Sequence, residues 1–253
     1  MNNRVLIKVY IIFTVIIVTI SIPLLVGLLK ISSVDLSIQY PSTSVIITKQ
    51  YVQEVLFDKF GNLTNYRRNH INTKVIKKYL EELDFVDYAY VSVSLSGILR
   101  IYITQKLIIA RIYNHNGKQF YMDSKMGIID VQRQQQIAKC FIVTGHDNEI
   151  PIKKIDSLTD KDYLVIYKLA MLIHNDDILS KWISGVTKKD QKWIMLPSQG
   201  DYTITLNEDS SFWEEEINRL HYLIEYSFSK RGWDDYENID LRFYNQVVCT
   251  KKE

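Results

Sequence analysis

Hydrophobic and polar residues follow several patterns along this chain, and the first is an unbroken apolar run near the N-terminus. Residues 9–29 carry no charge, and Lys8 and Lys30 close the run on either side. At a rise of about 1.5 Å per residue, a helix over this run is long enough to cross a hydrocarbon core of about 30 Å. The pattern therefore predicts a transmembrane helix over residues 9–29.

The charges before the run predict its orientation. Arg4 and Lys8 are basic and have no acidic neighbour, so the positive-inside bias predicts a cytoplasmic tail over residues 1–8 and export of the chain that follows. A cleaved signal peptide is the alternative. The run is too long for such a peptide, and no small-x-small cleavage site follows Leu29. We expect a membrane-anchored, exported protein.

Residues 31–106 form the first predicted exported domain. Residues 34–40 alternate between apolar and polar types, as a half-buried strand does. Helical periodicity follows over residues 48–61 and from about 73 to 83. Residues 89–103 then contain two alternating segments joined by a Ser-Gly turn, which indicates a hairpin. The predicted order is β-α-α-β-β.

Residues 107–253 form the second predicted domain, in which short strand patterns dominate. Two helical segments interrupt them, from about 159 to 174 and from 211 to 232. Residues 239–249 alternate apolar and polar side chains and predict a last strand almost at the chain end. We expect a mainly antiparallel β domain with two helices, and an α+β fold class for the whole chain.

Composition bounds the possible partners and the redox chemistry. A formal net charge of +2 gives no bulk electrostatic reason to bind nucleic acid. Cys140 and Cys249 could pair in an oxidising compartment or remain buried free thiols, and one bridge would not make a disulfide scaffold.

A basic group before and within the second helical segment has no acidic residue among it: Arg67, Arg68, His70, Lys74, Lys77 and Lys78. Such a group suits anionic lipid headgroups or an acidic partner close to the membrane. A solvated loop and helix face is the alternative, and we favour it.

Motifs that carry reaction chemistry are missing from the sequence. It contains no Gly-x-Ser-x-Gly elbow, no phosphate-binding Gly-rich loop and no His-Glu-x-x-His pair, and its five histidines lie far apart. We therefore expect no catalytic residue, no metal site, no cofactor and no small-molecule substrate. An exported domain without such chemistry is expected to act by holding other chains.

Residues 31–106 resemble a POTRA (polypeptide-transport-associated) domain. The resemblance rests on the element order and on the stretch KYLEELDFVDYAYVSVSLSGILRIYITQK, in which a helix ends in Leu and a strand begins after Phe-Val. The resemblance implies a module that offers sheet edges and helix faces to other chains.

The whole chain resembles the FtsQ/DivIB cell-division proteins. The stretches that carry the resemblance are QKLIIARIYNHNGKQFYMDSKMG, CFIVTG, WIMLPSQGDYTITL and NIDLRFYNQVV, in this order. The chain departs from the family pattern at Leu107, where Pro is usual, and at Asn207, where Gly is usual. These departures concern loop lengths.

This resemblance implies a partner-binding site near the C-terminus. In the family, the last strand and the helix before it receive FtsB, which travels with FtsL. The family's Asp-Leu-Arg-aromatic stretch matches residues 240–243, which implies an ion-pairing role for Arg242 and an apolar anchor at Phe243. The complete set of expected partner-binding residues is Asp240, Arg242, Phe243, Tyr244, Gln246 and Val247, the last three by adjacency alone.

The expected mode of binding depends on where the last strand lies. At a sheet edge, its free N–H and C=O groups could accept a strand from FtsB. The alternative is a strand that is fully paired within its own sheet.

The hypothesis from the sequence is a non-enzymatic scaffold of the division machinery. It would lie in the cell inner membrane as a single-pass type II protein, with its C-terminal domain in the periplasm at the division septum. It would couple FtsB- and FtsL-like proteins, and other divisome membrane proteins, to septal peptidoglycan synthesis.

Two other function classes stay open. The first is a POTRA-bearing chaperone or translocation component for envelope proteins, which predicts repeated POTRA units or a following barrel. The second is a membrane-tethered envelope hydrolase, which needs a clustered nucleophile or metal set. Neither feature is visible in the sequence.

Overall fold

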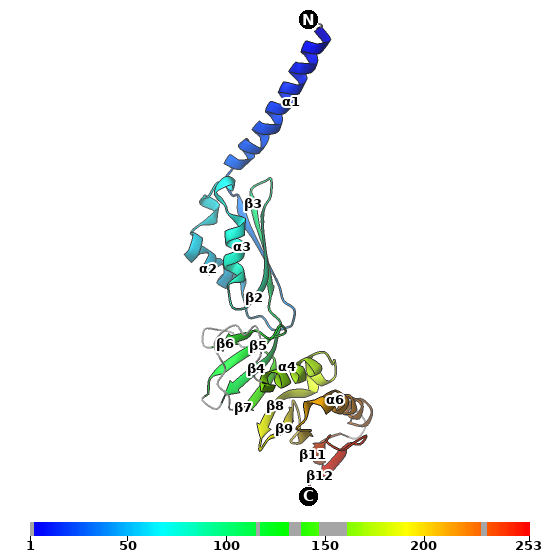
Figure 1. Cartoon of the computed structure of the whole chain (residues 1–253). Helices are drawn as coiled ribbons and strands as arrows, with labels where there is room; N and C mark the ends of the chain where they lie inside the picture. Colours follow the sequence, from blue (N-terminus) through cyan, green and yellow to red (C-terminus); the bar gives the residue numbers. More distant parts are fainter. Residues whose placement is uncertain (1–2, 115–116, 132–137, 147–160, 229–231) are drawn as a thin grey trace. The chain divides into compact units, whose positions relative to one another are not determined.

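The computed structural model describes residues 3–114, 117–131, 138–146, 161–228 and 232–253 (Figure 1). The chain divides into two compact units, Met1–Lys106 and Leu107–Glu253. Each unit has its own β-sheet.

The N-terminal apolar run forms the helix α1 (Asn3–Leu28). The prediction that it is a transmembrane helix is wrong: no helix among the described residues is long and apolar enough to cross a bilayer.

The rest of the first unit packs two helices on one face of a three-stranded sheet. Its elements are β1 (Ser33–Gln39), α2 (Lys49–Phe60), α3 (Thr73–Glu81), β2 (Val86–Val93) and β3 (Ile98–Gln105), with short 3-10 turns at Leu63–Asn65 and Arg68–His70. The strand order is β1-β3-β2, with β1 parallel and β2 antiparallel to β3. The order β-α-α-β-β agrees with the alternation in the sequence, and the POTRA assignment stays a prediction.

Local side-chain chemistry fixes the helix starts in this unit. The Thr48 hydroxyl accepts a hydrogen bond from the Tyr51 N–H and caps α2. The Asn72 amide oxygen does the same for the Val75 N–H and caps α3. The buried Gln105 amide accepts from the N–H groups of Ile46 and Ile47, at 2.8 and 3.0 Å, and holds the loop before α2 against the end of β3.

The second unit contains a nine-stranded sheet in the order β12-β11-β10-β9-β8-β7-β4-β5-β6. The strands are β4 (Ile108–Asn114), β5 (Gln119–Asp123), β6 (Ile128–Asp130), β7 (Phe141–His146), β8 (Ile183–Lys189), β9 (Lys192–Pro197), β10 (Thr203–Leu206), β11 (Tyr236–Asp240) and β12 (Val248–Lys251). The sheet is mixed, because β4–β7, β7–β8 and β10–β11 are parallel pairs.

Helices of the second unit supply the rest of its core. They are α4 (Lys161–His174), the short α5 (Leu179–Trp182), α6 (Trp213–Tyr222) and a π-helical turn, η5 (Leu223–Phe228), that continues α6. Their buried side chains, among them Ile166, Leu169, Trp213, Ile217 and Leu220, join those of the sheet in one hydrophobic cluster.

The single last strand predicted over residues 239–249 is in fact two strands with a corner between them. β11 ends at Asp240, residues 241–247 form the corner, and β12 begins at Val248. The corner includes Asn245 at a positive φ of 55°, a backbone conformation that interrupts a strand and that Asn tolerates better than most residues.

Candidate functional site

The strand β12 lies at one end of the nine-stranded sheet. It pairs antiparallel with β11, with Asp240 opposite Val248, Ile239 opposite Cys249 and Asn238 opposite Thr250. In the order of the described strands, nothing follows β12 on its other side. Val248 is 38% exposed, and Thr250 and Lys251 are exposed as well. The strand therefore presents a backbone edge to solvent.

The hydrogen bonds at the end of β12 show which backbone groups face the open edge. The Lys252 N–H donates to the Asp235 carbonyl at 2.9 Å, toward β11. Because successive N–H groups of a strand point to opposite sides, the N–H of Lys251 faces away from β11. This edge can pair with an incoming strand.

Two elements that are distant in the sequence hold the corner between β11 and β12. Leu241 is fully buried, and its N–H donates to the Thr205 carbonyl at 3.0 Å. Its carbonyl accepts a hydrogen bond from Nη2 of Arg219, on α6, at 2.7 Å. The corner then turns at residues 243–246, where the Gln246 N–H donates to the Phe243 carbonyl at 3.4 Å. The start of the corner is therefore tied both to the sheet and to α6.

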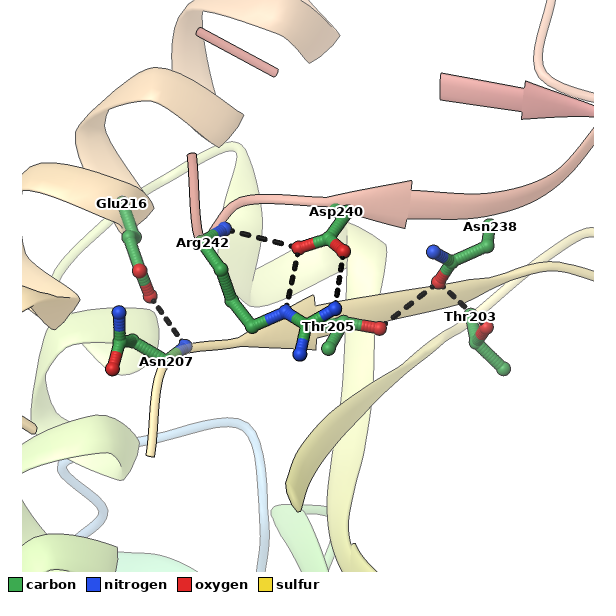
Figure 2. Close-up of polar contacts among 7 residues, drawn as sticks. All are labelled: Thr203, Thr205, Asn207, Glu216, Asn238, Asp240 and Arg242. Atoms are coloured by element: carbon green, nitrogen blue, oxygen red, sulfur yellow. Dashed lines mark hydrogen bonds and ion pairs between the residues drawn. The ribbon is translucent and has the colours of Figure 1, made fainter. Parts of the chain in front are cut away.

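An ion pair within the chain closes the same corner (Figure 2). Nε of Arg242 donates to Oδ1 of Asp240 at 2.9 Å, and Nη2 donates to Oδ2 at 2.6 Å. The backbone N–H of Arg242 also donates to Oδ1, at 3.1 Å. Burial opposes ionisation of Asp240, but the hydrogen bonds from Arg242 outweigh it and lower the pKa of this carboxyl.

Three further hydrogen bonds in Figure 2 fix the elements around the corner. Oδ1 of Asn238 accepts hydrogen bonds from the hydroxyls of Thr203 and Thr205, each at 3.0 Å, and so links β11 to β10. Oε2 of Glu216, on α6, accepts from the Asn207 N–H at 3.1 Å. Glu216 is only 1% exposed, and burial raises the pKa of its carboxyl.

The structure places the residues singled out from the sequence in two groups: an ion pair, and four residues of the corner after it. Asp240 is buried and pairs with Arg242, so these two contact each other. Phe243 and Tyr244 are 44% and 80% exposed and lie on the corner. Gln246 is exposed on the corner and Val247 packs partly against the core.

The sequence analysis left the position of the last strand open, and the order of the described strands places β12 at the sheet edge. Sequence reasoning missed the break between β11 and β12, for which Asn245 was a signal, and the contact of Arg219 with the corner. No local pattern signals the second, because Arg219 and Leu241 lie on different elements.

The residues that the structure describes contain no group of three or more His, Cys, Asp or Glu side chains that could hold a metal ion. Cys140 and Cys249 are both free thiols. Burial raises the pKa of Cys140 to about 12, so its reactive thiolate is scarce at neutral pH.

The family model described as FtsQ/DivIB, C-terminal related, matches residues 108–250, which is more than half of the chain. The chain belongs to this family. The match begins in β4 and ends in β12, so it includes the corner and the open edge. A comparison with curated proteins found no match.

Membership of the FtsQ/DivIB family identifies a cell-division protein. The family consists of non-enzymatic scaffolds that act at the division site with other divisome proteins.

Proposed function

We propose that this protein holds FtsB- and FtsL-like partners by accepting a partner strand at β12. The observation that carries the proposal is the position of β12 at the end of the sheet, with its outer N–H and C=O groups turned away from β11. Main-chain hydrogen bonds would supply affinity, and side chains beside the strand would supply selectivity.

The corner provides the side chains for that selectivity. Phe243 and Tyr244 are large, exposed and next to the edge in sequence. Aromatic side chains of this kind give much of the binding energy in protein interfaces. Asp240 and Arg242 have a different role in this proposal: they shape the corner, and the remaining Arg242 donors are available to a partner carboxylate.

In the cell, the complex would couple these partners to septal peptidoglycan synthesis in the periplasm. This part of the proposal extends the division role of the family. It needs the C-terminal unit on the outer face of the inner membrane, which protease accessibility in intact spheroplasts would test. Protection of the unit there would overturn the periplasmic location.

Depletion of the protein tests the function directly. Loss of a division scaffold gives filamentous cells in which DNA segregates and septa do not form. Complementation with the wild-type chain should restore septa, whereas a chain with a blocked edge, such as Lys251→Pro, should not. Normal division after depletion would overturn the proposal.

Capture of partners from native membranes provides a second, independent test. The full chain should co-purify with short FtsB- and FtsL-like chains, identified by mass spectrometry. Recovery of envelope proteins in their unfolded form instead would contradict the scaffold function.

A further inference from the structure

The sheet of the first unit has one face that its helices do not cover. The helices α2 and α3 pack on the opposite face (Figure 1). Alternation along β3 turns Leu99, Ile101 and Ile103 toward those helices, where each is at most 1% exposed. The side chains between them, Arg100 and Tyr102, are exposed on the other face.

Two neighbouring rows of this open face combine aromatic rings with small polar side chains. Each row runs across the sheet from β1 through β3 to β2, because the strands pair in register. Neither row contains an aliphatic or a charged side chain. We call the two rows the tyrosine face: Ser37, Tyr102 and Tyr90 in the first, and Gln39, Thr104 and Tyr88 in the second.

The rings of the tyrosine face are accessible to a ligand. Tyr90, Tyr88 and Tyr102 are 53%, 44% and 37% exposed. The hydroxyl of Tyr102 donates to Oε1 of Gln39 on β1, so its ring extends away from β2, which lies on the other side of β3. Within the described part of the chain, the side chain of Tyr90 has no hydrogen bond and no ring contact. The rings of Tyr90 and Tyr102 are therefore not stacked on each other.

The charges beside the tyrosine face favour an uncharged ligand. In the next row, Asp35 of β1 lies opposite Arg100 of β3, so the charges that flank the face have opposite signs. The ammonium of Lys77 lies 5.1 Å from the centroid of the Tyr88 ring, so a cationic group already contacts this ring. A ligand of strong positive or negative charge finds no complementary surface here.

The size of the open face argues against a stable protein partner. Its three strands have seven or eight residues each. At about 3.4 Å per residue and about 4.8 Å between strands, they cover about 400 Å². A specific protein interface buries about 800 Å² on each partner. A narrow and flat ligand fits the smaller area.

Two kinds of uncharged chain stack on exposed aromatic rings: a proline-rich peptide and a glycan. The hydroxyl and amide groups of the tyrosine face both donate and accept hydrogen bonds. A proline-rich segment offers carbonyl acceptors but few N–H donors. Sugar hydroxyls donate and accept as the face does, and the C–H side of a sugar ring can pack on the negative face of an aromatic ring. The chemistry of the face therefore favours the glycan.

We propose that the tyrosine face binds an uncharged oligosaccharide chain. Sugar rings stack on Tyr90 and Tyr102, and sugar hydroxyls exchange hydrogen bonds with Ser37, Gln39 and Thr104. This surface lies in the first unit, so the inference goes beyond strand binding at β12 and is independent of it.

Isothermal titration calorimetry of the full chain tests the inference, with chitohexaose and cellohexaose as probes. Wild type should bind at least one of these uncharged hexasaccharides saturably. Tyr90→Ala should weaken this binding by about tenfold, because a stacked ring is lost. Tyr90→Phe keeps the ring and should bind within about threefold of wild type. Added salt should leave the affinity unchanged, since the ligand carries no charge.

A matched variant and a blocking variant separate the face from general effects. Tyr51→Ala removes an exposed tyrosine of α2, on the covered side of the sheet, and should bind as wild type does. Ser37→Arg keeps all three rings but places a guanidinium beside Tyr102, where it can stack on the ring and exclude the sugar. Circular dichroism should show an unchanged fold in each variant, because all three positions are exposed.

Three outcomes would overturn the inference. The first is the absence of saturable binding of either hexasaccharide to wild type. The second is an equal loss of binding in Tyr90→Ala and Tyr51→Ala. The third is binding of hexaproline that depends on Tyr90, without binding of either sugar, which would assign the face to a peptide.

Discussion

The guanidinium of Arg242 folds back onto the carboxylate of Asp240, two residues earlier, with Nε–Oδ1 and Nη2–Oδ2 distances of 2.9 and 2.6 Å. Three hydrogen bonds, including one from the Arg242 backbone, thus connect the last residue of β11 to the corner that follows it. The pair orients the chain as it leaves β11, at the point from which Phe243 and Tyr244 extend into solvent.

Replacement of Asp240 by Asn should weaken the corner in a pH-dependent way. The folded-state pKa of Asp240 lies below its ordinary value of 3.8, so its carboxylate stabilises the fold above that value, and the contribution is lost as the pH falls through the folded pKa. At pH 7 we expect Asp240→Asn to lower the free energy of unfolding by about 1–2 kcal/mol. The difference from wild type should shrink below about pH 4.

Urea denaturation followed by Trp fluorescence measures this effect, because all four Trp residues lie in the second unit. Asp201→Asn, at an exposed carboxylate, serves as the control. A loss of stability that stayed constant from pH 7 to pH 3 would show that the charge of Asp240 has no part in it.

Substitution of Lys251 by Pro should reduce partner binding through the backbone alone. The Lys251 N–H faces the open edge, so Pro removes a donor that an incoming strand would use, while the inward hydrogen bond from Lys252 remains. We expect an affinity loss of about tenfold, equivalent to about 1.4 kcal/mol. Titration calorimetry with the purified partner pair measures it.

Lys251→Ala is the matched control, because it removes the same side chain and keeps the N–H. It should bind within about twofold of wild type, since exposed charges contribute little. Equal losses in the two variants would mean that the side chain, and not the strand edge, contacts the partner.

Truncation of Tyr244 should separate binding from stability. The side chain is 80% exposed, so Tyr244→Ala should change the free energy of unfolding by less than about 0.5 kcal/mol. If Tyr244 packs against the partner, its loss should lower the affinity by about tenfold or more. Tyr90→Ala, at an exposed tyrosine of the first unit, should leave partner affinity unchanged, and a similar loss there would refute a specific role for the corner.

The carboxylate of Asp176 should stabilise the start of α5. It accepts hydrogen bonds from the N–H groups of Ile178 and Leu179, each at 2.9 Å, and contacts Nδ1 of His221 at 2.7 Å. Burial opposes its ionisation, but these hydrogen bonds prevail and lower its pKa. Asp176→Ala should cost about 1 kcal/mol at neutral pH, an effect that disappears in acid below the folded pKa.

Thermal unfolding at several pH values checks this prediction, with the exposed neighbour Asp177→Ala as the reference. If both variants lost equal stability, local backbone propensity and not the cap would explain the result.

Local signals in the sequence were sufficient for most elements of the first unit. Residues 34–40 alternate with the period of a strand, and Gly61 provides the positive φ of 69° at which α2 ends. The apolar run at the N-terminus likewise predicted a helix correctly, yet the inference that the helix crosses a membrane is not supported. Periodicity gives secondary structure because it depends on near neighbours alone.

The candidate site depended on contacts that no local pattern contains. Asn245 breaks the predicted last strand because its backbone enters the left-handed region, and only the pairing of β12 with β11 shows where the strand resumes. The strands β10 and β11 are parallel neighbours in the sheet, although α6 separates them in the sequence. Such pairings are decided by which surfaces can be buried together after collapse.

By itself, the sequence determined that this chain folds as α+β, carries no recognisable reaction chemistry and resembles a division scaffold. Tertiary structure alone decided that β12 is the open edge, that Arg242 is paired within its own chain and that Arg219 holds the corner from α6. The physical reason is that alternation fixes which face of a strand is buried, whereas its neighbours are fixed by long-range packing and hydrogen bonding.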